Sequence, residues 1–169
     1  RYFDYLDLLV GIEQKRLREW TIANLNEFVE KYPTDERNDR IVLWKAQTFM
    51  LDNKKKEAEV SFAQMSELFP ESKFMPEALY SRGELLTEKL GKHQEAVDVL
   101  HEMVDKYPEN EFAPQAQFKL GQILEKRTKD YQSALNAYGV LVNNYPDYYQ
   151  VYDAYWALAK INKDYLFPF

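Results

Sequence analysis

Acid–base and metal chemistry would depend first on the two histidines of this 169-residue chain. His93 and His101 lie eight positions apart (101 − 93 = 8), and Glu102 follows the second. A zinc site needs three or four ligands, and a helical hydrolytic site spaces its histidines as HExxH. The pair has neither that spacing nor a third ligand. We interpret it as one turn histidine and one surface histidine, and we predict no metal site.

Motifs for nucleophilic or phosphate chemistry are also missing from the sequence. Cysteine is absent, which excludes disulfides, thiolate catalysis and cysteine-bound zinc. There is no GxSxG motif and no glycine-rich phosphate loop. We therefore predict that the protein is not an enzyme and holds no cofactor. A chain without cysteine suits either a reducing or an oxidising compartment.

The charge pattern is acidic, with a net charge of −6. The one lysine run, Lys54 to Lys56, is typical of a solvated turn. Nucleic-acid binding needs clustered Lys and Arg against phosphate, so we expect no nucleic acid among the partners. A second group of charges has helical spacing and predicts a solvated helix face, or a docking patch for a basic partner: Glu95, Asp98, Glu102 and Asp105.

Composition favours an ordinary folded domain or a short repeat array. Hydrophobic residues make up 46% of the chain and charged residues 30%, which argues against disorder. No apolar run reaches the ~18 residues of a membrane-spanning helix, so we expect no span in this segment. The chain begins at Arg1 rather than Met, which leaves room for a leader or anchor removed ahead of it.

An internal repeat supplies the elements that would position any binding residues. Residues 76–108 and 114–146 align with a shift of 38 positions (114 − 76 = 38). The shift places Pro76 on Pro114, and it also superposes the pairs Ala78 and Ala116, Tyr80 and Phe118, Gly83 and Gly121, Leu86 and Leu124, and Ala96 and Ala134. Matches of the same type at so many separated positions indicate tandem structural repeats.

Aromatic-proline pairs mark the ends of the repeats. They stand at Tyr32-Pro33, Phe69-Pro70, Tyr107-Pro108 and Tyr145-Pro146. Proline cannot continue a helix, so each pair predicts a helix end. We expect one repeat domain over 1–169, with units at about 1–33, 34–70, 71–108 and 109–146 and a terminal helix at 147–163. The first unit is predicted to be either two helices with a turn near 15–18 or one long helix. Asp147 and Gln150 resemble a capping box for the terminal helix.

Each unit is predicted to be a helical hairpin that buries its apolar face by stacking on its neighbours. Turns are expected at Asp52 to Lys54, at Gly91 and at Thr128 to Asp130. Small residues recur where two helices would approach closely, at Ala46, Gly83, Gly121 and Ala159 on first helices and at Ala58, Ala96 and Ala134 on second helices. The predicted fold is an all-α superhelical solenoid of about four hairpins.

This pattern resembles the tetratricopeptide repeat, which implies a right-handed solenoid and a protein-binding role. One unit matches at Leu79, Gly83, Leu86, Ala96, Leu100 and Pro108, and the next at Leu120, Gly121, Leu124, Ala134, Tyr138 and Pro146. The unit before them matches at Ala46, Phe49, Ala58, Phe62 and Pro70. It is one residue shorter between its small residues (58 − 46 = 12) than the next unit (96 − 83 = 13).

Three units end in Tyr-Pro, and two of them start with Phe-x-Pro-x-Ala, at 74–78 and 112–116. These features resemble those of a bacterial envelope subgroup of the repeats. That subgroup includes the periplasmic Tol-Pal-associated repeat protein and the lipoprotein subunit of the outer-membrane β-barrel assembly machine. The resemblance implies a periplasmic location or one at the periplasmic face of the outer membrane. The cytoplasm is the alternative.

First helices line the concave face of such a solenoid, which is where we expect a partner protein or peptide to bind. In this register Leu43, Tyr80, Phe118 and Trp156 form a ladder of anchors, unless they are partly buried against second helices. The predicted groove residues are Arg40, Leu43, Gln47, Met50, Glu77, Tyr80, Glu84, Thr87, Gln115, Phe118, Gln122, Glu125, Asp153, Trp156 and Lys160.

Some members of this family clamp the C-terminal carboxylate of chaperones with Lys, Arg and Asn. The corresponding places here hold Leu43, Gln47, Ser81, Gln115 and Lys119. Lys119 alone fits that role, so we expect no chaperone-tail binding.

Residues 145–156 contain six aromatic rings, which are expected either to pack internally or to be covered by a missing repeat or a partner. We therefore predict a non-catalytic scaffold or adaptor of a multiprotein complex in a bacterial cell envelope, in assembly or secretion machinery. One alternative is a homo-oligomeric structural protein that associates through the aromatic end. Another is an interaction segment of a larger regulator or enzyme.

Overall fold

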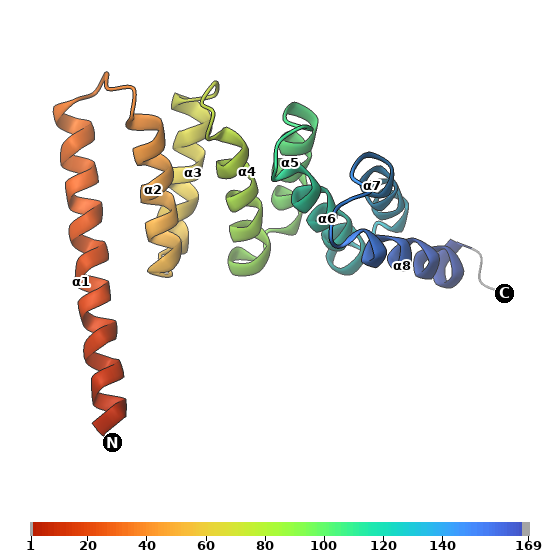
Figure 1. Cartoon of the computed structure of the whole chain (residues 1–169), viewed down its shortest axis with the longest axis horizontal. Helices are drawn as coiled ribbons and strands as arrows, with labels where there is room; N and C mark the ends of the chain where they lie inside the picture. The colour runs from red at the N-terminus through yellow and green to blue at the C-terminus, as the bar shows by residue number, and fades with distance from the viewer. Residues whose placement is uncertain (1, 167–169) are drawn as a thin grey trace. The chain divides into compact units, whose positions relative to one another are not determined.

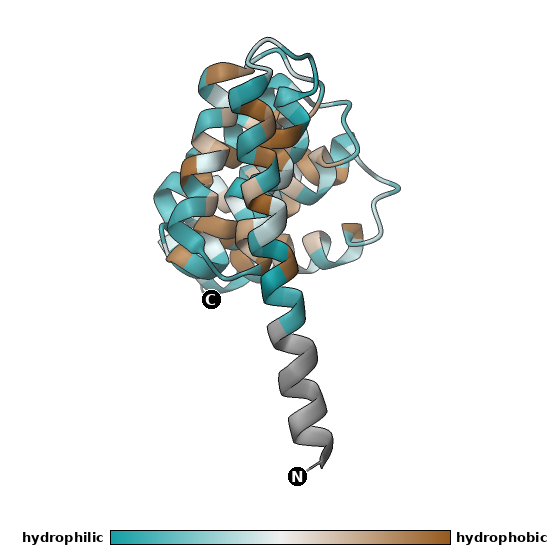
Figure 2. Ribbon diagram, turned by 90° about the vertical axis from the view of Figure 1, so that its left-hand side faces the viewer, coloured by the Kyte–Doolittle hydropathy of each residue, from teal (hydrophilic) through white to brown (hydrophobic). Residues whose placement is uncertain are grey.

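The computed structural model describes the backbone of residues 2–166 and the side chains of residues 13–165, and within them every regular element is helical. Figure 1 labels the helices α1 to α8. They belong to two compact units, one ending at Met75 and one beginning at Pro76. Figure 2 shows hydrophobic residues gathered on the helices and mostly hydrophilic residues on the loops. The all-α prediction is confirmed for this part of the chain.

Unit 1 contains α1 (Tyr2–Lys31), α2 (Asn38–Leu51) and α3 (Lys55–Leu68). The turn considered near residues 15–18 does not exist, because α1 continues through all 30 of its residues. The helix contains one glycine, Gly11, and no proline, and a single Gly costs only about 1 kcal/mol. The Arg18 guanidinium joins α1 to the end of α2 through Asp52, at 2.9 Å.

Unit 2 contains α4 (Met75–Glu84), α5 (His93–Lys106), α6 (Ala113–Ile123), α7 (Tyr131–Asn144) and α8 (Val151–Ile161). Short π-helical turns extend three of them: η1 (Leu85–Leu90) follows α4, η2 (Leu124–Thr128) follows α6 and η3 (Asn162–Leu166) follows α8. The capping box expected at Asp147 is wrong. Helix α8 begins only at Val151, after the residues from Tyr148 to Gln150 have formed a turn.

The π-helical turns explain the extra residue in the longer repeats. Gly83 and Ala96 are thirteen positions apart (96 − 83 = 13), as are Gly121 and Ala134 (134 − 121 = 13), and η1 or η2 lies between them. Ala46 and Ala58 are twelve apart (58 − 46 = 12), and α2 ends there without such a turn. A π-helical turn accommodates one additional residue inside a helix. The hairpin contacts are therefore kept despite the difference in length.

Left-handed residues close these helices at the same repeat position. Asn53, Gly91 and Lys129 have φ angles of 55°, 67° and 62°, and they are 38 residues apart (91 − 53 = 38; 129 − 91 = 38). A left-handed residue ends a helix and redirects the chain. The predicted turns at these three places are confirmed.

Small residues set the distance between paired helices. Gly83 faces the Leu100 side chain and Gly121 faces the Tyr138 ring, so a Cβ at either glycine would lie within 2.7 Å of its neighbour. Ala46, Ala58, Ala96 and Ala134 are all fully buried. Ala159 does not have the expected role. It is exposed, because no described helix packs on that side of α8.

Candidate functional site

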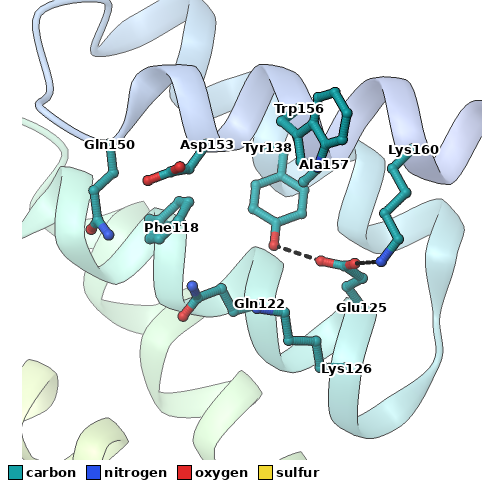
Figure 3. Close-up of a pocket in the computed structure, with 10 residues that line it drawn as sticks. All are labelled: Phe118, Gln122, Glu125, Lys126, Tyr138, Gln150, Asp153, Trp156, Ala157 and Lys160. Carbon is teal, nitrogen blue, oxygen red and sulfur yellow. Dashed lines mark hydrogen bonds and ion pairs between the residues drawn. The ribbon is translucent and has the colours of Figure 1, made fainter.

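A cavity of about 370 Å³ opens in unit 2 between α6 and α8 (Figure 3). Six of the fifteen predicted groove residues line it: Phe118, Gln122, Glu125, Asp153, Trp156 and Lys160. The remaining lining residues are Lys126, Tyr138, Gln150 and Ala157. The repeat register thus brings together residues that are 35 positions apart in the sequence, such as Phe118 and Asp153 (153 − 118 = 35).

A second cavity of about 220 Å³ adjoins the first and shares the lining residues Phe118, Gln122 and Gln150 with it. Its other lining residues are Tyr80, Gln115, Lys119, Tyr148 and Tyr149. We call the lining of the two cavities together the unit 2 groove. Side-chain amides stand at the junction of the two cavities, and amides both donate and accept hydrogen bonds.

Glu125 is a buried carboxylate at the base of the first cavity. The Tyr138 hydroxyl donates a hydrogen bond to its Oε2 at 3.0 Å, and the Lys160 ammonium lies 3.4 Å from its Oε1. Figure 3 shows the three side chains in a line. Burial of Tyr138, and then the charge of Glu125, raise the pKa of the tyrosine well above its usual range. The trio is internally satisfied, so it forms part of the wall of the cavity.

The expected ladder of exposed anchors is not present as a set. Phe118 is only 6% exposed, because its ring packs against Tyr138 and Tyr148 with centroids 5.9 and 6.3 Å apart. Leu43 is 2% exposed and belongs to the core of unit 1. Both side chains therefore present little surface to a partner. Trp156, at 74% exposed, is the one member of the ladder that is open to solvent.

Tyr80 is half-buried at the far end of the unit 2 groove. Its ring stacks on Phe112 with centroids 5.5 Å apart, and its hydroxyl donates to Glu84 at 3.2 Å. Burial and the nearby Glu84 carboxylate raise the pKa of Tyr80. These contacts hold the ring in place, so it forms a fixed end wall of the groove.

Lys119 is already neutralised, which argues further against a carboxylate clamp. Its ammonium lies 2.9 Å from Glu88 and 3.7 Å from Glu84. The predicted groove residues Glu77 and Thr87 differ in burial. Glu77 is half-buried, whereas Thr87 is buried and donates its hydroxyl to the Gly83 carbonyl, so Thr87 is not available to a partner.

Four predicted groove residues belong to unit 1: Arg40, Leu43, Gln47 and Met50. The Arg40 guanidinium lies over the rings of Trp44 and Phe74, at 4.6 and 5.5 Å. Gln47 and Met50 are half-buried on α2. None of the four lines the unit 2 groove.

Sequence reasoning missed seven residues that line the groove. Four of them lie on helical elements: Lys119, Lys126, Tyr138 and Ala157. The other three, Tyr148, Tyr149 and Gln150, lie in the turn between α7 and α8, outside the helical register from which the groove was predicted. The aromatic density of residues 145–156 was the signal that could have located these three.

The described part of the chain contains no cluster of side chains arranged for catalysis. No group of three or more His, Cys, Asp or Glu is arranged there to hold a metal ion. Among the helices that the structure describes, none has the length and apolarity to cross a membrane. The acidic face of α5 is solvated as expected, with Glu95 and Glu102 paired to Lys92 and Lys106.

Two stretches match the family model of the tetratricopeptide repeat, residues 77–110 and 115–148. Both lie in unit 2 and together contribute most of the unit 2 groove. The two stretches are therefore similar to tetratricopeptide repeats, and the fold of the chain is a helical solenoid like that of such repeats. No curated protein matches the chain in sequence.

Solved structures of repeat proteins share the fold. A tetratricopeptide repeat protein from Parabacteroides merdae ATCC 43184 aligns with a TM-score of 0.72 at 16% identity, over 95% of this chain and 60% of that one. The chain thus spans 60% of the length of that protein. MamA protein aligns at 0.67 and 19% identity, over 95% and 80% of the two chains. MamA from Desulfovibrio magneticus RS-1, from residue 41 onward, aligns at 0.60 and 20% identity, over 92% and 82%.

Proposed function

We propose that this chain is a non-catalytic scaffold that binds an extended segment of a partner protein in the unit 2 groove. The observation that carries the proposal is that two adjacent cavities share Phe118, Gln122 and Gln150 in their linings. Amides such as Gln122 can pair with both the N–H and C=O groups of an extended backbone. The exposed Trp156 ring offers an apolar surface for a side chain of that segment.

The setting that we propose is a multiprotein complex of a bacterial cell envelope, in the periplasm or at the periplasmic face of the outer membrane. Support comes from the Phe-x-Pro-x-Ala starts and the Tyr-Pro helix ends of the repeats. In the structure Tyr145 donates its hydroxyl to the Pro108 carbonyl at 2.9 Å, so this ending links successive loops. Fractionation of source cells, with an antibody against the chain, tests the setting separately from binding.

Photo-crosslinking tests the groove. A photoreactive amino acid at position 122 faces the groove, whereas one at position 98 lies on the solvated face of α5. We expect an adduct with a second, different protein from position 122 in source cells and none from position 98. Tyr149→Ala should reduce the yield, because this exposed ring lines the groove. Equal yields from positions 122 and 98 would contradict the proposal.

A second candidate function is self-association through α8. Tyr152 and Trp156 are 81% and 74% exposed one turn apart on that helix. Rings of this size are rarely left open on a monomer surface at adjacent positions. Light scattering of the purified chain separates the candidates, because the groove proposal alone predicts a monomer in the absence of a partner.

A further inference from the structure

A further cavity of about 340 Å³ lies between the second helices of unit 2, α5 and α7. Helix α6 packs against both of these helices and forms the floor. We call this space the α5–α7 cavity. Its lining and that of the unit 2 groove share no described residue. A site here is therefore separate from the one proposed for the extended segment.

Gln117 of α6 is a buried polar residue of this cavity and is only 4% exposed. Its Nε2 donates a hydrogen bond to the Ala137 carbonyl on α7 at 2.9 Å. Its Oε1 accepts no hydrogen bond from the described residues, and protein atoms do not enclose it, so it faces the cavity. In such a buried setting a hydrogen bond is stronger than in water. The floor of the cavity thus presents one free acceptor to a ligand.

An amide is unexpected at this position of the repeat. The repeat shift aligns Gln117 with Leu79 (117 − 79 = 38), and the shorter unit aligns Leu79 with Val42 (79 − 42 = 37). Both aliphatic side chains are buried. An apolar residue can therefore fill the position, whereas a buried amide with an unpaired oxygen destabilises the fold. Residues that break a local rule of the fold in this way are expected where function requires them.

Carboxylates dominate the charge around the α5–α7 cavity. The described lining residues include Asp105 and His101 but no lysine or arginine. An adjacent cavity shares three lining residues with this one and adds Glu109. Neither Asp105 nor Glu109 forms an ion pair with a described residue. Lys106 lies outside the lining and pairs with Glu102 at 2.8 Å. The charge pattern therefore favours a positively charged ligand.

We infer that the α5–α7 cavity binds the side chain of an arginine from a partner protein. The planar guanidinium has five N–H donors and no acceptor, which suits both Oε1 of Gln117 on the floor and the carboxylate of Asp105 on α5. Val104 and Val140 line the cavity and offer apolar contacts to the aliphatic stem. Lysine concentrates its charge on one compact ammonium, so it cannot distribute donors in the same way. Arginine is also enriched at protein interfaces.

NMR titration of the full chain with the blocked peptide acetyl-Ala-Ala-Arg-Ala-Ala-amide tests the inference. We expect binding in the millimolar range, with shifts in the side-chain amide of Gln117 and the backbone amide of Val104. Peptides with lysine or citrulline in place of arginine are the ligand controls. The lysine peptide should bind several-fold more weakly. The citrulline peptide, which keeps the shape without the charge, should bind about tenfold more weakly or less well still.

Substitutions separate binding from folding. Gln117→Leu introduces the residue of the preceding repeat, so it should keep or raise the urea midpoint while weakening the arginine peptide about tenfold or more. Gln115→Leu makes the same change on α6 in the lining of the unit 2 groove and should leave the affinity unchanged. Asp105→Asn should also weaken binding, whereas Asp98→Asn on the solvated face of α5 should not.

Three results would overturn the inference. One is equal affinity for the arginine and citrulline peptides, and another is unchanged affinity in folded Gln117→Leu. If Gln117→Leu does not fold, unchanged affinity in Asp105→Asn has the same force. Much tighter binding of free arginine than of the peptide would indicate a small-molecule ligand and overturn the choice of a protein partner. Crosslinking from position 122 is independent of these results, because that position lines the unit 2 groove.

Discussion

A Cβ atom on Gly121 would lie 2.7 Å from Cε1 of the Tyr138 ring. The preceding repeat has the same arrangement, in which a Cβ on Gly83 would lie 2.6 Å from Leu100. A glycine inside a helix costs about 1 kcal/mol relative to alanine. The close approach of the second helix offsets this cost, because Tyr138 and Leu100 are both fully buried by it. Each glycine therefore serves helix packing rather than chain flexibility.

Gly121→Ala should destabilise the protein by about 1–3 kcal/mol, because the Tyr138 ring must move to accept the methyl group. Gly139 provides the matched control, because it lies on α7 of the same helix pair and nothing is within 4 Å of the Cβ atom that alanine would add there. Gly139→Ala should stabilise by about 0.5–1 kcal/mol through helix propensity alone. Urea denaturation measures both changes. Effects of the same sign in the two variants would contradict the packing role.

Ala96→Leu should overpack the hairpin of α5 with α4 and lower the free energy of unfolding by about 1–3 kcal/mol. Ala96 is fully buried and follows η1 in the repeat. Ala23 on α1 is exposed, so Ala23→Leu should change stability by less than about 0.5 kcal/mol. Thermal melting followed by circular dichroism compares the two variants. An unchanged melting curve for Ala96→Leu would mean that the repeat register is misassigned.

Lys129→Gly should stabilise the protein by about 0.5–1 kcal/mol. Lys129 has a φ angle of 62°, in the left-handed region, which costs a non-glycine residue roughly 1–2 kcal/mol. Glycine removes this cost, but it also loses more backbone entropy on folding, which cancels part of the stabilisation. Gly91 holds the same repeat position with φ 67°. Gly91→Lys should therefore shift the denaturation midpoint in the opposite direction. Identical shifts in the two variants would show that φ does not decide stability at this turn.

The fold was predictable because its signals are local and repeated. Prolines, the turn at Gly91 and the buried alanines each act within one hairpin, and the repeat shows them more than once. The continuity of α1 was not determined by any local signal, because Gly11 is compatible with both a helix and a turn. The extra residue of the longer repeats was visible in the sequence. Its accommodation in the π-helical turns η1 and η2 was not, because that depends on how the helix packs against its neighbours.

The site was predictable in its position but not in the exposure of its members. Helical spacing placed Phe118 and Trp156 at equivalent positions, and both line the groove. Their exposures differ because Tyr138 on α7 and the turn at Tyr148 cover Phe118, whereas Trp156 is 74% exposed. Burial depends on which elements follow in space, and the spacing of residues within one repeat does not contain that information.

Stability should fall as the pH rises above about 10. Burial raises the pKa values of Tyr80, Tyr138 and Tyr148 in the folded chain above the ordinary value of 10.0. Above pH 10 the unfolded chain releases these phenolic protons while the folded chain retains them, so the unfolded state gains stability. Below pH 10 both states keep the protons and the effect vanishes. Denaturation midpoints at pH 8 to 11 would show the decline.

Tyr138→Phe tests the assignment of this decline. The variant removes one of the retained protons, so the slope of stability against pH above 10 should become shallower by up to about 1.4 kcal/mol per pH unit. At neutral pH the variant should lose about 1 kcal/mol, because Glu125 loses its hydrogen bond from the hydroxyl. A slope identical to that of the wild type would exclude Tyr138 as a source of the effect.

Phe118→Ala and Tyr149→Ala should separate the structural ring of the groove from the accessible one. Phe118 is buried against Tyr138 and Tyr148, so its truncation should cost about 3–5 kcal/mol of stability. Tyr149 is 77% exposed, so its truncation should change stability by less than about 0.5 kcal/mol. Chemical denaturation of the two variants gives both values.

The same two variants should rank differently in partner capture. At a temperature where circular dichroism shows both to be folded, Tyr149→Ala should lower the crosslinking yield from position 122, because its ring lines the groove without supporting the core. Phe118→Ala should leave the yield close to that of the wild type at this temperature, because little of that side chain is exposed to a partner. A large loss of capture in folded Phe118→Ala, with none in Tyr149→Ala, would show that the partner enters the core rather than lying along the groove.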